Sequence, residues 1–258
     1  MTGIQKILNT FFLLSLIGVI SYLSIALKKD KEYKIELISL EGNVHLSKER
    51  YLGFADLLDR SKYGNLTLQI IKDRIEKHPY VETADVCYNG NNSVAIKIKE
   101  KNFESILVQN NRQYLLTDKL QALPFLPKTA KIDYPVISEV EMYDSIKVLK
   151  SLKNNYDVLT ASKILTGFRL LNPELFDELS MVDMRRGGDI VLSFSSFNYP
   201  VIVGRGNEIG KVVYFNSIWT YLKGKQLNDY MNYVDLRFSG HVFFGINKDS
   251  LHVESKKI

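Results

Sequence analysis

Residues 66–86 read LTLQIIKDRIEKHPYVETADV, and this stretch carries the clearest secondary-structure signals in the chain. Leu68, Ile71 and Ile75 recur at the i, i+3, i+7 spacing of one helical face. Thr67 precedes them and can cap the helix, and the later His-Pro pair ends it, because proline lacks an N–H and restricts its predecessor. Apolar and polar residues then alternate, which indicates a half-buried strand. The stretch therefore predicts a helix followed by a strand.

The sequence on both sides extends this pair into a larger unit. Upstream, residues 35–40 alternate as a strand, and a second helix is predicted over residues 48–60. Downstream, two more alternating runs flank Asn89-Gly90, a dipeptide that favours the positive φ angles of a hairpin turn. Residues 35–100 are thus predicted to fold in the order β-α-α-β-β.

A long uncharged run lies near the amino terminus. Residues 7–27 contain no charged side chain, and roughly 20 helical residues can cross a hydrocarbon core about 30 Å thick. We therefore expect a transmembrane helix there. A cleaved signal peptide is the alternative, because residues 24–26 (SIA) include the small residues that a signal peptidase uses. One lysine precedes the run and four lie between residues 28 and 34, so the positive-inside rule alone would place the large domain in the cytoplasm.

The carboxy-terminal half carries mixed signals. Apolar residues recur at helical spacing over residues 139–154, which predicts a helix, and the pattern through residue 179 favours no single element. A last hairpin is predicted around Ser239-Gly240. The remaining expected elements are a strand over 113–117, a proline-rich loop, strands over 181–184 and 190–194 around a turn at 185–188, a strand over 201–203 and a helix over 207–223.

Charge and cysteine content restrict the possible functions. The chain of 258 residues has a net charge of +5 and a pI near 9.0. Its basic residues are interspersed with acidic ones and form no stripe with aromatics, so we expect no nucleic-acid binding. Cys87 is the only cysteine, which excludes an intramolecular disulfide. The alternation around it predicts a partly buried packing residue.

No motif in the sequence indicates catalysis. The four histidines are far apart, fit no metal-binding pattern and are expected to be solvated. Residues 201–210, VIVGRGNEIG, are similar to a dinucleotide-binding loop, but the third glycine comes one residue too late, so a strand-to-helix turn is predicted. We therefore expect no catalytic residue, metal, cofactor or small-molecule substrate. An envelope hydrolase with dispersed catalytic groups stays open as an alternative.

Several phrases of the sequence carry a family resemblance. The phrases ISLEGNVHLSKER (38–50), the opening stretch (66–86) and VAIKIKEK (94–101), in β-α-α-β-β order, resemble a POTRA domain. An uncharged amino-terminal run, one such domain, YLLTD (114–118) before a proline-rich loop and a closing YVDLRF (233–238) together resemble the FtsQ/DivIB family of bacterial cell division proteins. Leu120-Gln121 departs from the family, which leads us to expect a glycine there, so a different type of turn is predicted.

The resemblance implies an α+β fold with an amino-terminal transmembrane helix, a β-α-α-β-β POTRA domain, and a mixed α/β domain whose mainly antiparallel sheet ends in an edge-strand hairpin. It also implies a single-pass protein of the cell inner membrane at the division septum, with a cytoplasmic amino terminus and periplasmic or extracytoplasmic domains. The expected divisions are a cytoplasmic tail (1–6), the transmembrane helix (7–27), a linker (28–34), the POTRA domain (35–101), an FtsQ-type β domain (102–246) and a carboxy-terminal tail (247–258).

The function implied by the resemblance is a non-enzymatic scaffold that links early and late division proteins. FtsB- and FtsL-type partners would bind the carboxy-terminal edge strands, because an added strand can pair with the free N–H and C=O groups of a sheet edge. Other division proteins would contact the POTRA domain. The expected partner-binding residues are Arg185, Arg186, Tyr233, Val234, Leu236, Arg237, Phe238, Val242 and Phe244. The alternative is a POTRA-containing docking or chaperone-like protein of outer-membrane assembly or secretion.

Overall fold

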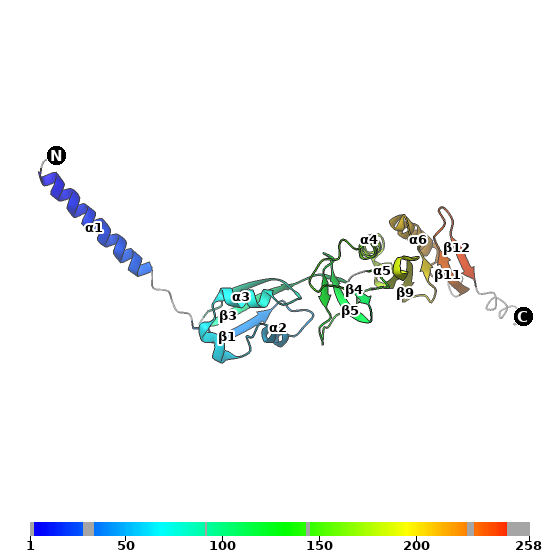
Figure 1. Ribbon diagram of the computed structural model, residues 1–258, viewed down its shortest axis with the longest axis horizontal. Helices are drawn as coiled ribbons and strands as arrows, with labels where there is room; N and C mark the ends of the chain where they lie inside the picture. The colour runs from blue at the N-terminus through cyan, green and yellow to red at the C-terminus, as the bar shows by residue number, and fades with distance from the viewer. Residues whose placement is uncertain (1–2, 28–33, 91, 143–144, 226–229, 247–258) are drawn as a thin grey trace, which may run out of the picture.

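The computed structural model is elongated, and its three-stranded and nine-stranded sheets follow one another along the long axis (Figure 1). The described residues are 3–27, 34–90, 92–142, 145–225 and 230–246. The expected carboxy-terminal tail, all of the expected linker except residue 34, and the first two residues of the expected amino-terminal tail lie outside these ranges.

Helix α1 (Gly3–Leu27) confirms that the uncharged run is helical. Its side chains are described without interruption from Thr10 to Leu23, and all of these are exposed. No helix among the described residues is long and apolar enough to cross a membrane. By that finding the prediction of a transmembrane helix over residues 7–27 is wrong.

The first sheet has the predicted β-α-α-β-β order. Its strand order is β1-β3-β2, with β1 parallel and β2 antiparallel to the central strand. Thr67 caps the second helix as predicted, since its hydroxyl accepts a hydrogen bond from the Ile70 N–H at 3.2 Å. The elements are β1 (Leu37–Glu41), α2 (Lys48–Phe54), the 3-10 helix η1 (Arg60–Asn65), α3 (Leu68–Glu76), β2 (Val81–Tyr88) and β3 (Ser93–Glu100).

Helix α2 ends at Phe54, six residues before the predicted end of the helix at residue 60. Asp56 has a φ of 54°, in the left-handed region that a right-handed helix cannot include. The chain therefore turns there, and the 3-10 helix η1 begins only where the predicted helix was expected to end.

The second sheet has nine strands in the order β12-β11-β10-β9-β8-β7-β4-β5-β6. Five of its eight neighbouring pairs are antiparallel, so the expectation of a mainly antiparallel sheet is confirmed. The strands are β4 (Phe103–Gln109), β5 (Arg112–Thr117), β6 (Ala122–Pro124), β7 (Val136–Ser138), β8 (Leu179–Asp183), β9 (Val191–Phe194), β10 (Val201–Ile202), β11 (Met231–Asp235) and β12 (Phe243–Ile246).

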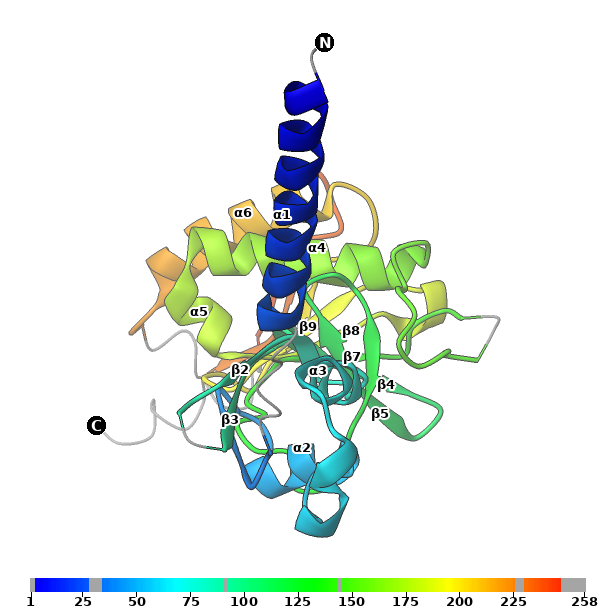
Figure 2. The same ribbon diagram turned by 90° about the vertical axis from the view of Figure 1, so that its left-hand side faces the viewer.

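Helices α4 (Tyr156–Leu171), α5 (Pro173–Asp177) and α6 (Glu208–Leu222) gather on one side of this sheet (Figure 2). Phe168 of α4 and Phe215 of α6 are almost fully buried, and both lie in the core that includes the strand residues of β8 and β9. The helices therefore cover one face of the sheet through apolar packing.

The helix predicted over residues 139–154 is wrong, because the described residues of that segment form loops and turns. Met142, Ile146 and Leu152 still pack against the core, so their helical spacing reflects burial of an irregular segment. Leu149 has a φ of 68°, which interrupts any helix. The helix begins instead at Tyr156, where the Asn155 side chain accepts a hydrogen bond from the Val158 N–H at 2.9 Å.

Three single-residue expectations also need revision. His45 and His78 are 7% and 3% exposed, so the expectation of solvated histidines is wrong for both. Cys87 is exposed, because it lies on the outer face of the edge strand β2, so it is not the partly buried residue predicted. Leu120 has a φ of 55°, so this turn adopts the backbone conformation that glycine favours although leucine occupies it.

Candidate partner-binding edge

The two edge strands of the nine-stranded sheet differ in whether another segment covers them. At one end, β6 is covered by a neighbouring segment: Ala122 N–H donates to the Lys150 carbonyl at 3.2 Å, and Leu149 N–H donates to the Ala122 carbonyl at 2.7 Å. Pro124 ends this strand and has no N–H to offer. At the other end, β12 pairs only with β11 among the described residues. One edge is therefore blocked, whereas no other strand of the described part of the chain pairs with the outer edge of β12, where a strand can be added.

The available edge strand is strongly apolar. Strand β12 reads FFGI and contains no charged residue. Phe243 is 50%, Phe244 39% and Ile246 41% exposed, although they alternate between the two faces of the sheet. Natural proteins usually protect such an edge with charges, proline or a covering segment. An unprotected apolar edge is a candidate site for strand addition.

Aromatic rings from adjoining segments extend this surface. The Phe238 and Phe243 rings lie with centroids 5.2 Å apart in an edge-to-face arrangement. On β11, the Tyr233 ring lies directly against Gly245, leaving no room for a side chain at that position. Glycine thus lets Tyr233 lie across the last strand pair, where it remains 40% exposed.

Some residues predicted to bind a partner belong to the protein's own core. Val234 and Leu236 are 0% and 2% exposed. Their N–H groups donate inside the sheet, from Val234 to the Pro200 carbonyl at 3.0 Å and from Leu236 to the Ile202 carbonyl at 2.8 Å. Val242 is partly buried against the same core. The exposed members of the predicted set at this edge are therefore Tyr233, Arg237, Phe238 and Phe244.

Arg237 follows β11 and is held by two carboxylates. Its guanidinium donates to Asp235 at 2.6 Å and to Asp189 at 2.8 Å. These hydrogen bonds, first the one with Asp235, raise the pKa of Arg237, and the hydrogen bond from Arg237 is also the main cause of the lowered pKa of Asp235. Arg237 therefore fixes the loop between β11 and β12 to the start of β9.

Arg185 and Arg186 follow β8, the middle strand of the sheet, and so lie away from its edge. Both have positive φ angles, 46° and 50°, in the turn after β8. Arg186 pairs with Glu139 at 2.5 Å, and Arg185 lies 3.6 Å from Asp183. Strands β8 and β11 are three positions apart in the sheet, roughly 14 Å at ordinary strand spacing. The structure does not bring these arginines beside β12.

A cavity of about 500 Å³ adjoins the loop after β11. It lies between this loop and the first turns of α6, and Tyr214, Arg237 and Phe238 are among its lining residues. The loop after β10, which is similar to a dinucleotide-binding loop, lines the other side. There Glu208 accepts from the Gly206 N–H at 2.7 Å, and Lys211 donates to the Val203 carbonyl at 2.9 Å. The segment between β10 and α6 is thus the strand-to-helix turn that the sequence predicts.

Two exposed residues of the edge were absent from the prediction. Phe243 and Ile246 are on β12, and both follow from the sequence FFGI once the strand is recognised as a last strand with no charge.

Among the described residues, no group of three or more histidine, cysteine, aspartate or glutamate side chains could hold a metal ion.

Comparison with known proteins gives consistent matches. The family model described as "POTRA domain, FtsQ-type" matches residues 33–101. The cell division protein FtsQ of Syntrophotalea carbinolica is 25% identical over 202 residues, which cover 78% of this chain and 70% of that protein. The FtsQ of Geotalea daltonii is 23% identical over 216 residues, covering 81% of this chain and 74% of that protein. These similarities favour a role in cell division over outer-membrane assembly, and they support the resemblance of the chain to the FtsQ/DivIB family of bacterial cell division proteins.

Proposed function

We propose that this protein is a non-enzymatic scaffold of the division machinery, which binds FtsB- and FtsL-type partners by adding a partner strand to β12. In this role it links early and late division proteins at the septum, and the POTRA region contacts other division proteins. The similarity to FtsQ proteins supports the division role. The observation that supports the binding mode is the uncharged strand β12, whose outer edge pairs with no other described strand.

The contrast with β6 supports this assignment. The same sheet protects β6 with backbone hydrogen bonds from the segment ending at Ser151 and with a terminal proline. An unprotected apolar strand elsewhere in the sheet would promote aggregation unless a partner covers it. A partner strand that pairs with the outer edge of β12 would explain why β12 is exposed while β6 is covered.

Strand addition would use both the backbone and the side chains of β12. Outward N–H and C=O groups would pair with the partner strand, and the partner's alternating side chains would contact Phe243 on one face and Phe244 with Ile246 on the other. Burying about 100 Å² of apolar surface would contribute roughly 2.5 kcal/mol before the costs of association are subtracted. Aromatic side chains supply much of such area, which makes Phe243 the most informative position to change.

The proposal is tested by Phe243→Lys in the full chain. The matched control is Tyr156→Lys, an equally charged change at an aromatic residue that is 64% exposed on α4. Affinity for the purified FtsB–FtsL complex of the same organism is measured by surface plasmon resonance. We expect at least about tenfold weaker binding for Phe243→Lys, about 1.4 kcal/mol, and unchanged binding for the control. Equal affinities for both variants, with native circular dichroism, would remove β12 as the binding edge.

A further inference from the structure

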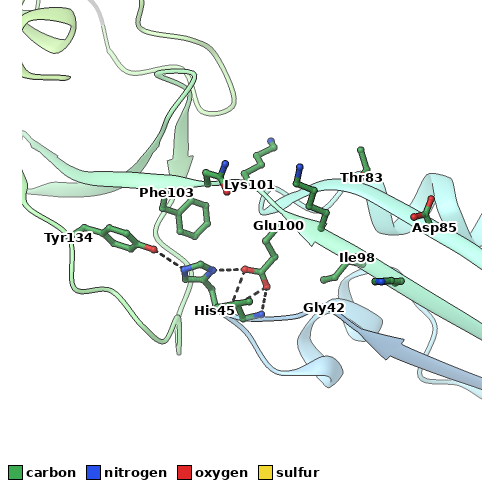
Figure 3. A pocket seen from close by; sticks show the side chains of 13 residues that line it. Gly42, His45, Thr83, Asp85, Ile98, Glu100, Lys101, Phe103 and Tyr134 are labelled. Carbon is green, nitrogen blue, oxygen red and sulfur yellow. Dashed lines mark hydrogen bonds and ion pairs between the residues drawn. The ribbon is translucent and has the colours of Figure 1, made fainter. Parts of the chain in front are cut away.

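The junction between the two sheets holds a buried carboxylate, Glu100, at the end of β3 (Figure 3). Its side chain is 5% exposed. It accepts hydrogen bonds from the Tyr51 hydroxyl at 2.6 Å, from the Val44 N–H at 2.7 Å and from the His45 N–H at 3.2 Å. Burial raises the pKa of Glu100, but these hydrogen bonds together with that of the His45 ring outweigh it and lower the pKa below its ordinary value. Glu100 is thus an ionised acceptor.

His45 links Glu100 to Tyr134, a residue outside the POTRA region. Its Nδ1 contacts the Glu100 carboxylate and its Nε2 lies 3.0 Å from the Tyr134 hydroxyl, so the three side chains form a continuous relay (Figure 3). Because the carboxylate can only accept, Nδ1 carries the hydrogen of that contact, and Nε2 is hydrogen-bonded to the Tyr134 hydroxyl. The Phe103 ring packs on the histidine with centroids 4.4 Å apart. The relay therefore joins β3 to a segment that leads into β7.

Residues 125–135, which we name the strap, connect β6 to β7 and lie against the POTRA region. Ala130 N–H donates to the His45 carbonyl at 2.8 Å. The Tyr80 hydroxyl accepts from the Leu126 N–H at 2.9 Å and lies 3.0 Å from the Thr129 hydroxyl. The strap is thus attached to POTRA residues at both of its ends and in its middle.

Apolar packing crosses the same junction. One buried cluster contains POTRA residues such as Tyr51 and Tyr80 together with Phe103, Leu115 and Leu123 from the first strands of the nine-stranded sheet. Leu115 and Leu123 are 0% exposed. A shared core of this kind opposes hinge motion, because separating its parts would expose apolar surface.

We propose that the Glu100–His45–Tyr134 relay and the strap lock the POTRA region and the nine-stranded sheet into one rigid body. The lock fixes the distance between the POTRA surface and the β12 edge. It stands independently of the proposed partners, because it concerns only contacts within the chain. Loss of His45 would leave Glu100 and Tyr134 without their shared partner, so the strap would detach more readily from the POTRA region.

The lock is tested by the distance distribution between two spin labels in the full chain. Cys87 is exposed on β2 and is the only native cysteine, and Ser217→Cys places a second label on the exposed side of α6. Double electron–electron resonance should give one narrow distribution for the otherwise native chain and a broader one for His45→Ala. A broad or divided distribution in the otherwise native chain would overturn the rigid body. A His45→Ala distribution as narrow as the native one would overturn the relay as its lock.

A milder variant keeps the test informative if His45→Ala does not fold. Tyr134→Phe removes only the hydroxyl, and Tyr156→Phe makes the same change at an exposed tyrosine. Amide hydrogen exchange of Leu126 and Ala130 is followed in both variants. We expect about fivefold faster exchange in Tyr134→Phe and native exchange in the control, the effect of losing one hydrogen bond. Native exchange rates in both variants would contradict the relay.

Discussion

Among single residues, Glu100 shows most clearly how position in the fold determines chemistry. It belongs to a strand that alternates as a simple amphipathic pattern, yet it is buried and accepts hydrogen bonds from Tyr51, Val44 and His45. Its contact with His45 joins residues that are 55 positions apart in the chain. No local pattern indicates such a pair, which is why solvated histidines were the natural prediction.

Glu100 should make stability depend on pH in the acid range. Its pKa is lower in the folded chain than its ordinary value of 4.5, so its stabilising effect is complete above about pH 4.5 and is lost as the pH falls through the folded pKa. We expect Glu100→Gln to lower the free energy of unfolding by about 2–3 kcal/mol at pH 7, and by much less near pH 3. Urea unfolding at both pH values measures this. The exposed control Glu174→Gln should change little, and an equal loss at both pH values would show that the carboxylate charge is not responsible.

At the scale of elements, the sequence pattern predicted the helices and strands whose caps, turns and pairing strands lie close by in the sequence. Helix α3 and the hairpin of β2 and β3 occur as expected because caps, turns and alternation all agree locally. Residues 139–154 have helical spacing without a helix, because their apolar side chains fill the core from loops. The last hairpin was predicted, but the burial of Val234 and Leu236 was not, since alternation alone does not show which face of a strand covers the core.

The strand β11 therefore gives a prediction about folding rather than binding. Leu236 lies just after β11, is buried and donates its N–H to the Ile202 carbonyl at 2.8 Å. Leu236→Pro should lower the free energy of unfolding by roughly 3 kcal/mol or more, because it removes this hydrogen bond and the core side chain together. Leu236→Met preserves the volume and should cost less than about 1.5 kcal/mol. Chemical denaturation that gave native stability for Leu236→Pro would show that this strand is not part of the core.

At the scale of the whole molecule, the two sheets share a core at their junction, and the nine-stranded sheet exposes an apolar edge at its far end. The junction carries a common core and a polar relay, whereas the far end of the nine-stranded sheet exposes aromatic side chains on an edge strand. The sequence could indicate the POTRA order and the closing strands separately. It could not indicate the junction, because the strap reads as a proline-rich loop and acquires its role only through contacts with residues such as Tyr80.

Amide hydrogen exchange of the full chain, with and without the FtsB–FtsL complex of the same organism, tests strand addition at β12 most directly. Pairing with a partner strand protects the outward N–H groups of β12, while the covered strand β6 has no new partner to gain. We expect slower exchange over residues 243–246 in the complex and unchanged exchange over residues 122–124. Unchanged exchange over residues 243–246, with protection appearing in another part of the chain, would contradict the account.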